Sequence, residues 1–264
     1  MASKEHYQAW LSIALDIAQR GADIALSYFR RPLVVQDKAD GTPVTEADQR
    51  AEDKMRQLLR QHFPLHGIIG EEMGKHSDSA EYVWTVDPID GTRSFIRGIP
   101  LFGTLLGCLE QGKPVLGVMI LPALGDVFFA VKGGGTFCNS EPVRNPSTSQ
   151  LKSAFISASD RSYFVESKHL ELYELLHEKP GTFRGYTDCF GHSLVIRGCI
   201  DAMIDPRVSV WDIAPLACLA QEAQLKAFDF EGREDVFSKT FVTSTETLAP
   251  ELLKLIQEGG GVRS

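Results

Sequence analysis

The segment Asp87-Pro88-Ile89-Asp90-Gly91-Thr92 places two carboxylates close together, directly after the β-prone run Tyr82 to Val86. Carboxylate and carbonyl oxygens are the ligands of hard cations such as Mg²⁺. Alternation in a strand puts Ile89 on the same side as Asp87, so its carbonyl could join the Asp87 and Asp90 carboxylates around a cation. Gly91 and Thr92 could then offer backbone N–H groups to a phosphate at a helix start. Asp-Pro and Asp-Gly are also common turn signals, so these acids could merely cap the next helix.

Two further segments carry acids at the ends of expected elements. Gly70-Glu71-Glu72 follows the β-prone run Gly67 to Gly70, and Trp211-Asp212 lies at the start of an expected helix. Because three separate strand or helix ends bear carboxylates, the pattern favours a shared metal and phosphate site over three unrelated turns. An all-oxygen ligand set of this kind suits Mg²⁺ and not zinc.

These three segments resemble, in order and spacing, the three signatures of the inositol monophosphatase superfamily. The similarity extends from about Lys38 through Ala223. The resemblance implies that Mg²⁺ is held by Glu71, Asp87, the Ile89 carbonyl, Asp90 and Asp212, and that water attacks the phosphate directly, without a phospho-enzyme.

The resemblance also implies roles for Glu71, Thr92 and Asp48 in activating the attacking water. Glu71 would orient the water, and Thr92, held by Asp48, would help to activate it. Asp48 is at the same time the last residue of Thr45-Glu46-Ala47-Asp48, which has the pattern of a capping box that opens a helix. The catalytic and the capping role of Asp48 do not exclude each other.

Two runs resemble the histidinol-phosphatase branch of the superfamily, namely Arg97-Gly98-Ile99-Pro100 and Asp188-Cys189-Phe190-Gly191. Acids at Asp188 and Asp205 would favour a cationic substrate such as histidinol phosphate, which carries an ammonium and an imidazole. Alternatively, Asp188 caps a helix at Cys189 and Asp205-Pro206 forms a turn. The substrate contacts implied by position are Gly91, Thr92, Arg184, Tyr186, Thr187, Asp188, Asp205 and Asp212.

Other functions stay open at this stage. Inositol 1-phosphate is an alternative substrate, and a 3',5'-bisphosphate nucleotide is less favoured because no basic cluster for a second phosphate is evident. A regulatory binding protein that retains the fold is a different class, against which the complete set of carboxylates argues. Glu222-Ala223-Gln224-Leu225 departs from the usual Glu-Ala-Gly-Gly of the family, which weakens the subfamily assignment more than the metal site. His192 is expected to be a packed, hydrogen-bonded core histidine.

The elements that must position these residues can be read from hydrophobic periodicity. Helical spacing from Trp10 to Ala25 predicts a long first helix that Pro32 ends, followed by a polar loop over Asp37 to Pro43 and a second helix that ends near Pro64. Apolar segments from Gly103 to Val131 predict an antiparallel meander. Further predicted strands are Ala154 to Ala158, Ile200 to Ile204, Lys226 to Phe230 and Thr240 to Thr243, and further predicted helices are His169 to Leu176, Cys189 to Arg197, Trp211 to Ala223 and Leu248 to Gln257.

The fold that the resemblance implies is an α/β sandwich with layers α-β-α-β-α and the site between two fused lobes. The N-terminal lobe, residues 1–150, would carry most metal ligands, and the C-terminal lobe, residues 151–264, would carry the selectivity residues and the last ligand. A soft boundary is expected near Pro146 to Leu151. A homodimer is expected from the family only.

Composition limits the classes of function. The 264 residues have a net charge of -8, which argues against general nucleic-acid binding. Five scattered cysteines are odd in number and show no metal-ligand spacing, which favours reduced thiols. Residues 1–20 lack the pattern of a signal peptide and no membrane span is visible, so a cytoplasmic location is the default expectation.

Overall fold

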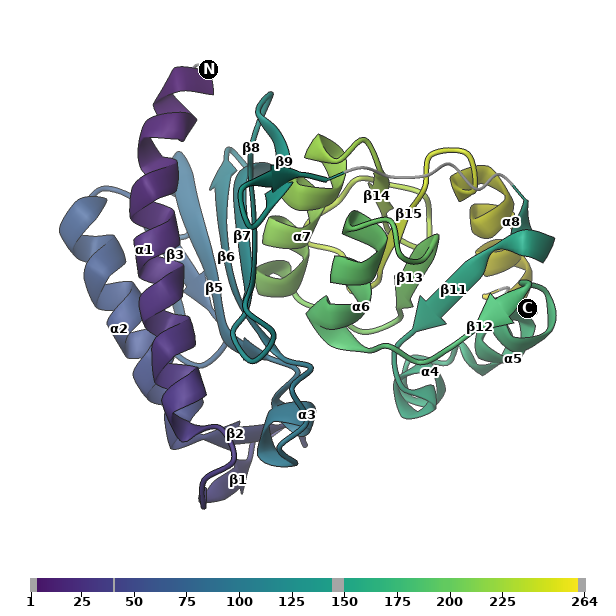
Figure 1. Cartoon of the computed structure of the whole chain (residues 1–264), viewed down its shortest axis with the longest axis horizontal. Helices are drawn as coiled ribbons and strands as arrows, with labels where there is room; N and C mark the ends of the chain where they lie inside the picture. Colours follow the sequence, from purple (N-terminus) through teal and green to yellow (C-terminus); the bar gives the residue numbers. More distant parts are fainter. Residues whose placement is uncertain (1–3, 40, 144–149, 261–264) are drawn as a thin grey trace.

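The computed structural model describes residues 4–39, 41–143 and 150–260, which form alternating layers of helices and sheets (Figure 1). Helices α1 (Lys4–Tyr28) and α2 (Glu46–His62) cover the outer face of the first sheet, and α6 (Asp188–Ile196) and α7 (Val210–Glu222) lie between the sheets. Helices α5 (Leu170–Glu178) and α8 (Ala249–Gly259) pack against the outer face of the second sheet. The predicted α-β-α-β-α sandwich is therefore confirmed.

The first sheet has eight strands in the order β10-β9-β8-β7-β6-β5-β3-β4. Its strands are β3 (Gly67–Gly70), β4 (Gly74–His76), β5 (Tyr82–Asp90), β6 (Gly103–Glu110), β7 (Lys113–Leu121), β8 (Asp126–Val131), β9 (Gly135–Cys138) and β10 (Glu141–Pro142). Strands β6, β7 and β8 form the predicted antiparallel meander. Strand β3 runs parallel to β5, with Gly70 opposite Val86, so the acids that follow both strands reach the same edge of the sheet.

The second sheet has five strands in the order β12-β11-β13-β15-β14. Its strands are β11 (Phe155–Ala158), β12 (Thr182–Phe183), β13 (Ala202–Asp205), β14 (Lys226–Phe228) and β15 (Phe241–Ser244). The predicted strands and helices of this half are confirmed to within two residues at each end. The short strands β1 (Val35–Asp37) and β2 (Pro43–Thr45), which were not predicted, pair as a small hairpin on either side of the predicted polar loop. The short helices α3 (Thr92–Ile96) and α4 (Arg161–Glu166) and a 3-10 turn (Leu151–Ser153) complete the elements.

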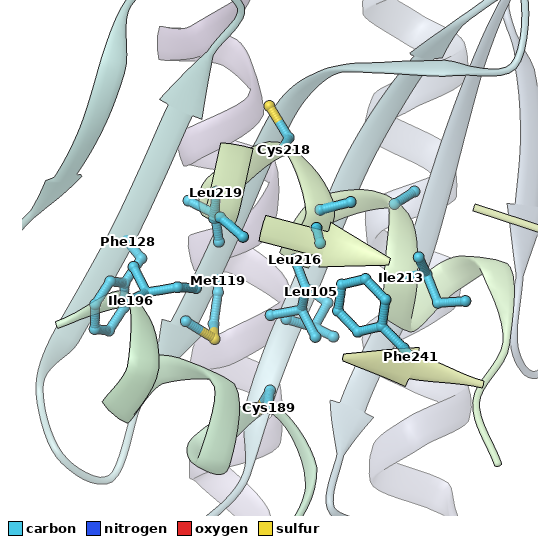
Figure 2. Close-up of a cluster of buried hydrophobic side chains, with 14 of the residues drawn as sticks. Leu105, Met119, Phe128, Cys189, Ile196, Ile213, Leu216, Cys218, Leu219 and Phe241 are labelled. Carbon is cyan, nitrogen blue, oxygen red and sulfur yellow. The ribbon is translucent and has the colours of Figure 1, made fainter. Parts of the chain in front are cut away.

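One hydrophobic cluster joins the two halves across α6 and α7 (Figure 2). Leu105 and Met119 of the first sheet meet Leu216 of α7, Ile196 of α6 and Phe241 of the second sheet. Helix α7 approaches the first sheet closely because Gly117 has no side chain: a Cβ there would lie 2.4 Å from the carbonyl oxygen of Pro215. The site edge of the first sheet is thereby held against the second half of the chain.

Three sequence expectations concern the chain as a whole. All five cysteines are free thiols, as predicted. Within the described part of the chain, no helix is long and apolar enough to cross a membrane. The boundary expected near residues 146–151 falls largely outside the described residues, and the division into lobes at residue 150 stays a prediction.

Candidate active site

A pocket of about 350 Å³ opens where the end of β5 faces α6, α7 and the end of β13. Most of the residues predicted for the site line it. These are Glu71, Asp87, Ile89, Asp90, Gly91, Thr92, Thr187, Asp188, Asp205 and Asp212. The sequence therefore identified the chemical character of the pocket, and Asp48, Arg184 and Tyr186 are the predicted residues that do not line it.

A β-bulge at the end of β5 brings Asp87 and Asp90 to the same pocket. Asp87 pairs with Leu105 and Asp90 with Gly103, so two residues of β5 lie opposite one residue of β6. Regular alternation would have placed residues three apart on opposite faces, and the extra residue of a bulge cancels that difference. Pro88, which has no N–H to give to a ladder, lies in the bulge, where strands tolerate proline.

The third acid of the site comes from the N-terminus of α7. Ser209 caps this helix in a capping box, in which the backbone N–H of Ser209 donates to Asp212 Oδ2 at 2.8 Å. Carboxylate oxygens of Asp87, Asp90 and Asp212, here called the acid cluster, lie within 4.8 Å of one another.

Burial and mutual repulsion make these acids hard to ionise. The pKa of Asp90 is raised to about 8, first by burial and then by the charge of Asp212, and the pKa of Asp212 is raised to about 7 by burial and the charge of Glu71. Burial and Glu71 raise the pKa of Asp87 well above its usual range. A divalent cation among the carboxylates would remove this penalty, so the residues present fit a metal ion with oxygen ligands.

Glu71 lies beside the acid cluster and is bound by a lysine. The ammonium of Lys38 donates to Oε1 of Glu71 and to Oε1 of Glu72, at 2.7 Å each. Lys38 follows β1 of the small hairpin, an element that the sequence analysis did not predict. Burial and the nearby Glu71 charge raise the pKa of Glu72 to about 7.

Asp48 completes the predicted capping box, in which Thr45 is the N-cap residue, but it makes no hydrogen bond to Thr92. Its Oδ2 accepts hydrogen bonds from the backbone N–H and the hydroxyl of Thr45, at 2.8 and 2.6 Å, which confirms the capping box. The hydroxyl of Thr92 donates to the Ile89 carbonyl at 2.9 Å, and Asp48 Oδ1 is buried without a partner. The predicted contact between Asp48 and Thr92 is therefore absent in this structure. The Thr92 hydroxyl has one proton, and it donates that proton to the Ile89 carbonyl. The catalytic roles of both residues stay predictions.

Helix α6 presents its N-terminal turn to the pocket. Thr187 is the N-cap residue, and Asp188 is the first helical residue, with a φ of +57°, so Asp188 is not the cap. The Asp188 carboxylate accepts a hydrogen bond from the Thr187 hydroxyl at 2.8 Å. The backbone N–H of Cys189 donates to Asp90 Oδ2, which ties α6 to the metal motif of the first sheet.

Arg184 and Tyr186 were predicted to contact the substrate, but they lie outside the pocket lining. Arg184 is exposed. The backbone N–H and carbonyl of Tyr186 both bond to the Ser157 hydroxyl, and its ring packs against Phe190 and Phe155. These contacts hold the segment against the second sheet and leave Thr187 and Asp188 as its members in the pocket.

A group of basic and aromatic side chains at the pocket was not predicted from the sequence. The guanidinium carbons of Arg93 and Arg207 lie 5.7 and 5.4 Å from the ring centroid of Tyr163, and all three residues line the pocket. Arg207 also pairs with Glu166 at 2.8 Å. No motif signalled this group, because Tyr163 belongs to the short helix α4, which only tertiary folding brings near Arg93.

Comparison with known proteins agrees with the geometry of the site. The model of the inositol monophosphatase family matches residues 6–260. Proteins named histidinol-phosphatase from Chlorobaculum parvum and Mycobacterium tuberculosis are 35% and 33% identical, over 94% of this chain in both cases and 97% and 98% of their own lengths. An inositol monophosphatase from Zymomonas mobilis has a similar structure, with a TM-score of 0.86 and 30% identity over 95% of this chain and 98% of that one. The chain belongs to the inositol monophosphatase family, and it is a phosphatase that hydrolyses phosphate monoesters.

Proposed function

We propose that the protein is a Mg²⁺-dependent phosphomonoesterase that converts L-histidinol phosphate and water into L-histidinol and phosphate. The observation that carries this proposal is the acid cluster of Asp87, Asp90 and Asp212 in one pocket with two further acids, Asp188 and Asp205. The first group suits a metal and a phosphate, and the second suits a cationic organic moiety.

The side chains that would hold Mg²⁺ are Glu71, Asp87, Asp90 and Asp212, together with the Ile89 carbonyl. When bound, Mg²⁺ would supply Lewis-acid stabilisation of phosphate charge and would acidify a coordinated water. Glu71 and Thr92, which line the same pocket, would orient that water. The new bond joins a water oxygen to phosphorus, and the ester oxygen leaves with a proton as the alcohol.

Substrate choice rests on the organic side of the pocket. Asp188 and Asp205 can pair with an ammonium, whereas an inositol ring offers only hydroxyl groups. The histidinol-phosphatase names of the relatives from C. parvum and M. tuberculosis support the same choice.

A phosphate-release panel with Mg²⁺ tests this proposal. We expect kcat/KM to be at least about tenfold higher for L-histidinol phosphate than for inositol 1-phosphate, since one charge-assisted hydrogen bond is worth about that factor. The variant Asp188→Asn should bring the two kcat/KM values closer together, because it removes a negative charge that can pair with the ammonium. Much faster hydrolysis of inositol 1-phosphate would reject histidinol phosphate as the substrate.

A second candidate substrate class is a 3',5'-bisphosphate nucleotide. Arg93 and Arg207, both close to Tyr163 at the pocket, favour a substrate with a second anionic group. A 3',5'-bisphosphate in the same panel, tested on wild type and on Arg93→Gln, separates this candidate from the first. A role in histidine biosynthesis, a cytoplasmic location and a homodimer stay predictions.

A further inference from the structure

His192 links the interior of the second sheet to the pocket. Its Nδ1 lies 2.8 Å from the hydroxyl oxygen of Thr243 on β15, and its Nε2 lies 2.8 Å from Oδ2 of Asp205 at the end of β13. The ring is buried, 1% exposed, and packs near Phe241 with ring centroids 5.1 Å apart. Three elements therefore fix this imidazole: α6, on which it lies, and two neighbouring strands.

Asp205 presents one carboxylate oxygen to His192 and keeps the other available. In the part of the chain that the structure describes, Asp205 Oδ1 has no hydrogen bond and is not among the buried atoms that lack a partner. Both Asp205 and His192 line the pocket. The oxygen that His192 does not bind is the one available to a ligand.

Asp205 would be poorly placed without this restraint. Its charge repels Asp90, Asp188 and Asp212, and contributes to the raised pKa of each. A carboxylate at the end of a strand can rotate about two side-chain bonds, and repulsion from three acids favours rotamers that point away from them. A donor at a fixed position holds the carboxylate in one orientation, as groups behind a binding residue commonly do.

We propose that His192 is a positioning residue, which holds Asp205 so that Oδ1 accepts a hydrogen bond from the ammonium of the substrate's organic moiety. This proposal rests on the proposed function. If His192 served only core packing, its replacement would lower stability and lower kcat/KM for all substrates alike. If His192 positions Asp205, in contrast, its replacement lowers kcat/KM more for a substrate whose ammonium contacts Asp205 than for a substrate without an ammonium.

The test compares His192→Phe with His192→Gln, because glutamine keeps an N–H donor that can reach Asp205 and phenylalanine keeps only bulk. The readout is the ratio of kcat/KM for L-histidinol phosphate to kcat/KM for inositol 1-phosphate. We expect His192→Phe to lower this ratio about tenfold, mainly through KM for histidinol phosphate. Without His192 the Asp205 carboxylate is no longer oriented, so its hydrogen bond to the substrate ammonium is weakened or lost. His192→Gln should recover most of the ratio. His177→Gln, at an exposed histidine of α5 that does not line the pocket, is the matched control.

Two further variants keep the proposal open to refutation if His192→Phe does not fold. Thr243→Val leaves His192 in place but removes its second anchor, and should lower the ratio by about threefold, since it removes one neutral hydrogen bond. Asp205→Asn shows how far the ratio falls when the carboxylate itself is removed. The proposal is overturned if His192→Phe or Thr243→Val lowers kcat/KM for both substrates equally, or leaves the ratio unchanged while Asp205→Asn lowers it.

The same data separate this proposal from the proposed function. If wild type does not prefer histidinol phosphate, the choice of substrate is wrong. If the His192 variants do not reproduce the change that Asp205→Asn causes, whichever substrate is preferred, the positioning role is wrong.

Discussion

Asp87, at the bulge of β5, has a carboxylate oxygen within 4.8 Å of a carboxylate oxygen of Asp212, in the first turn of α7. Burial and the charges of neighbouring carboxylates raise the pKa of both groups. Without a cation, the folded protein therefore holds protons at neutral pH that the unfolded chain would release. The metal site and the stability of the fold are linked through these protons.

The first prediction concerns pH and the metal-free protein. Asp212 and Asp90 have pKa values of about 7 and 8, against about 4 for an unfolded chain, so between these values the folded state holds more protons than the unfolded state. Stability then falls as pH rises through this window. In chelator, Tm should drop by about 3 °C or more between pH 6 and pH 9, which corresponds to about 1 kcal/mol for a chain of this size.

Added Mg²⁺ should raise Tm more at pH 9 than at pH 6, because binding requires the ionised carboxylates. Thermal unfolding at both pH values, with chelator and with Mg²⁺, gives the four numbers required. A Tm in chelator that stays level or increases toward pH 9 would speak against the raised pKa values of the acid cluster.

The chemistry of the site was predictable where it depends on residues adjacent in sequence. Asp87, Asp90 and Asp212 follow recognisable motifs, and the capping box from Thr45 to Asp48 is a local pattern. Ser209 to Asp212 has the same spacing and was overlooked, although the sequence contains the signal.

Other features depend on contacts between distant segments, and no local pattern reports them. The bulge at Pro88 is defined by its register with β6. The hydrogen bond from the Cys189 N–H to Asp90 depends on how α6 docks, as does the exclusion of Tyr186 from the pocket. Arg93 and Tyr163 meet only after the two halves have packed together.

A second prediction concerns Gly91, which directly follows Asp90 of the acid cluster and has a φ of +86°. A Cβ at this position would lie 3.0 Å from the carbonyl oxygen of Leu101 and 3.2 Å from Asp188 Oδ2, whereas Gly125, with a φ of +73°, has nothing within 4 Å. Alanine at either site costs about 1–2 kcal/mol for its left-handed backbone, but only Gly91→Ala adds a clash in the pocket.

We expect Gly91→Ala to be less stable than Gly125→Ala by about 1 kcal/mol or more and to lose at least about tenfold in kcat/KM, because site geometry shifts. Gly125→Ala should keep wild-type kcat/KM. Urea unfolding and phosphate release measure both effects. Equal losses in the two variants would show that the space around Gly91 is not restrictive.

A third prediction separates the two roles of Asp48. Asp48→Ala removes the acceptor of two Thr45 hydrogen bonds and should cost about 1–2 kcal/mol of stability, as the loss of a helix cap does. Thr45→Val keeps the bond from the Thr45 backbone N–H to Asp48, but it removes the hydroxyl that donates to Asp48 and accepts from the Ala47 N–H, so it should cost a similar amount of stability.

If Asp48 also serves catalysis, its removal should lower kcat beyond the effect of the lost cap. Thr45→Val should then reduce kcat much less than Asp48→Ala at temperatures where both variants are folded. Steady-state phosphate release, with circular dichroism to check folding, decides between the roles. Similar kcat values in the two variants would leave Asp48 with its capping role alone.

The central claim, that the acid cluster holds the metal on which phosphate hydrolysis depends, is tested most directly with Asp90→Asn. The measurement is phosphate release from L-histidinol phosphate by metal-stripped wild type and Asp90→Asn as Mg²⁺ is added back, with Mg²⁺ binding followed by calorimetry. We predict that activity of wild type returns with Mg²⁺, and that Asp90→Asn binds Mg²⁺ more weakly and stays about 100-fold or more below wild type, since a catalytic metal contributes several kcal/mol. Undiminished activity in stripped wild type, or wild-type Mg²⁺ binding and activity in Asp90→Asn, would contradict it.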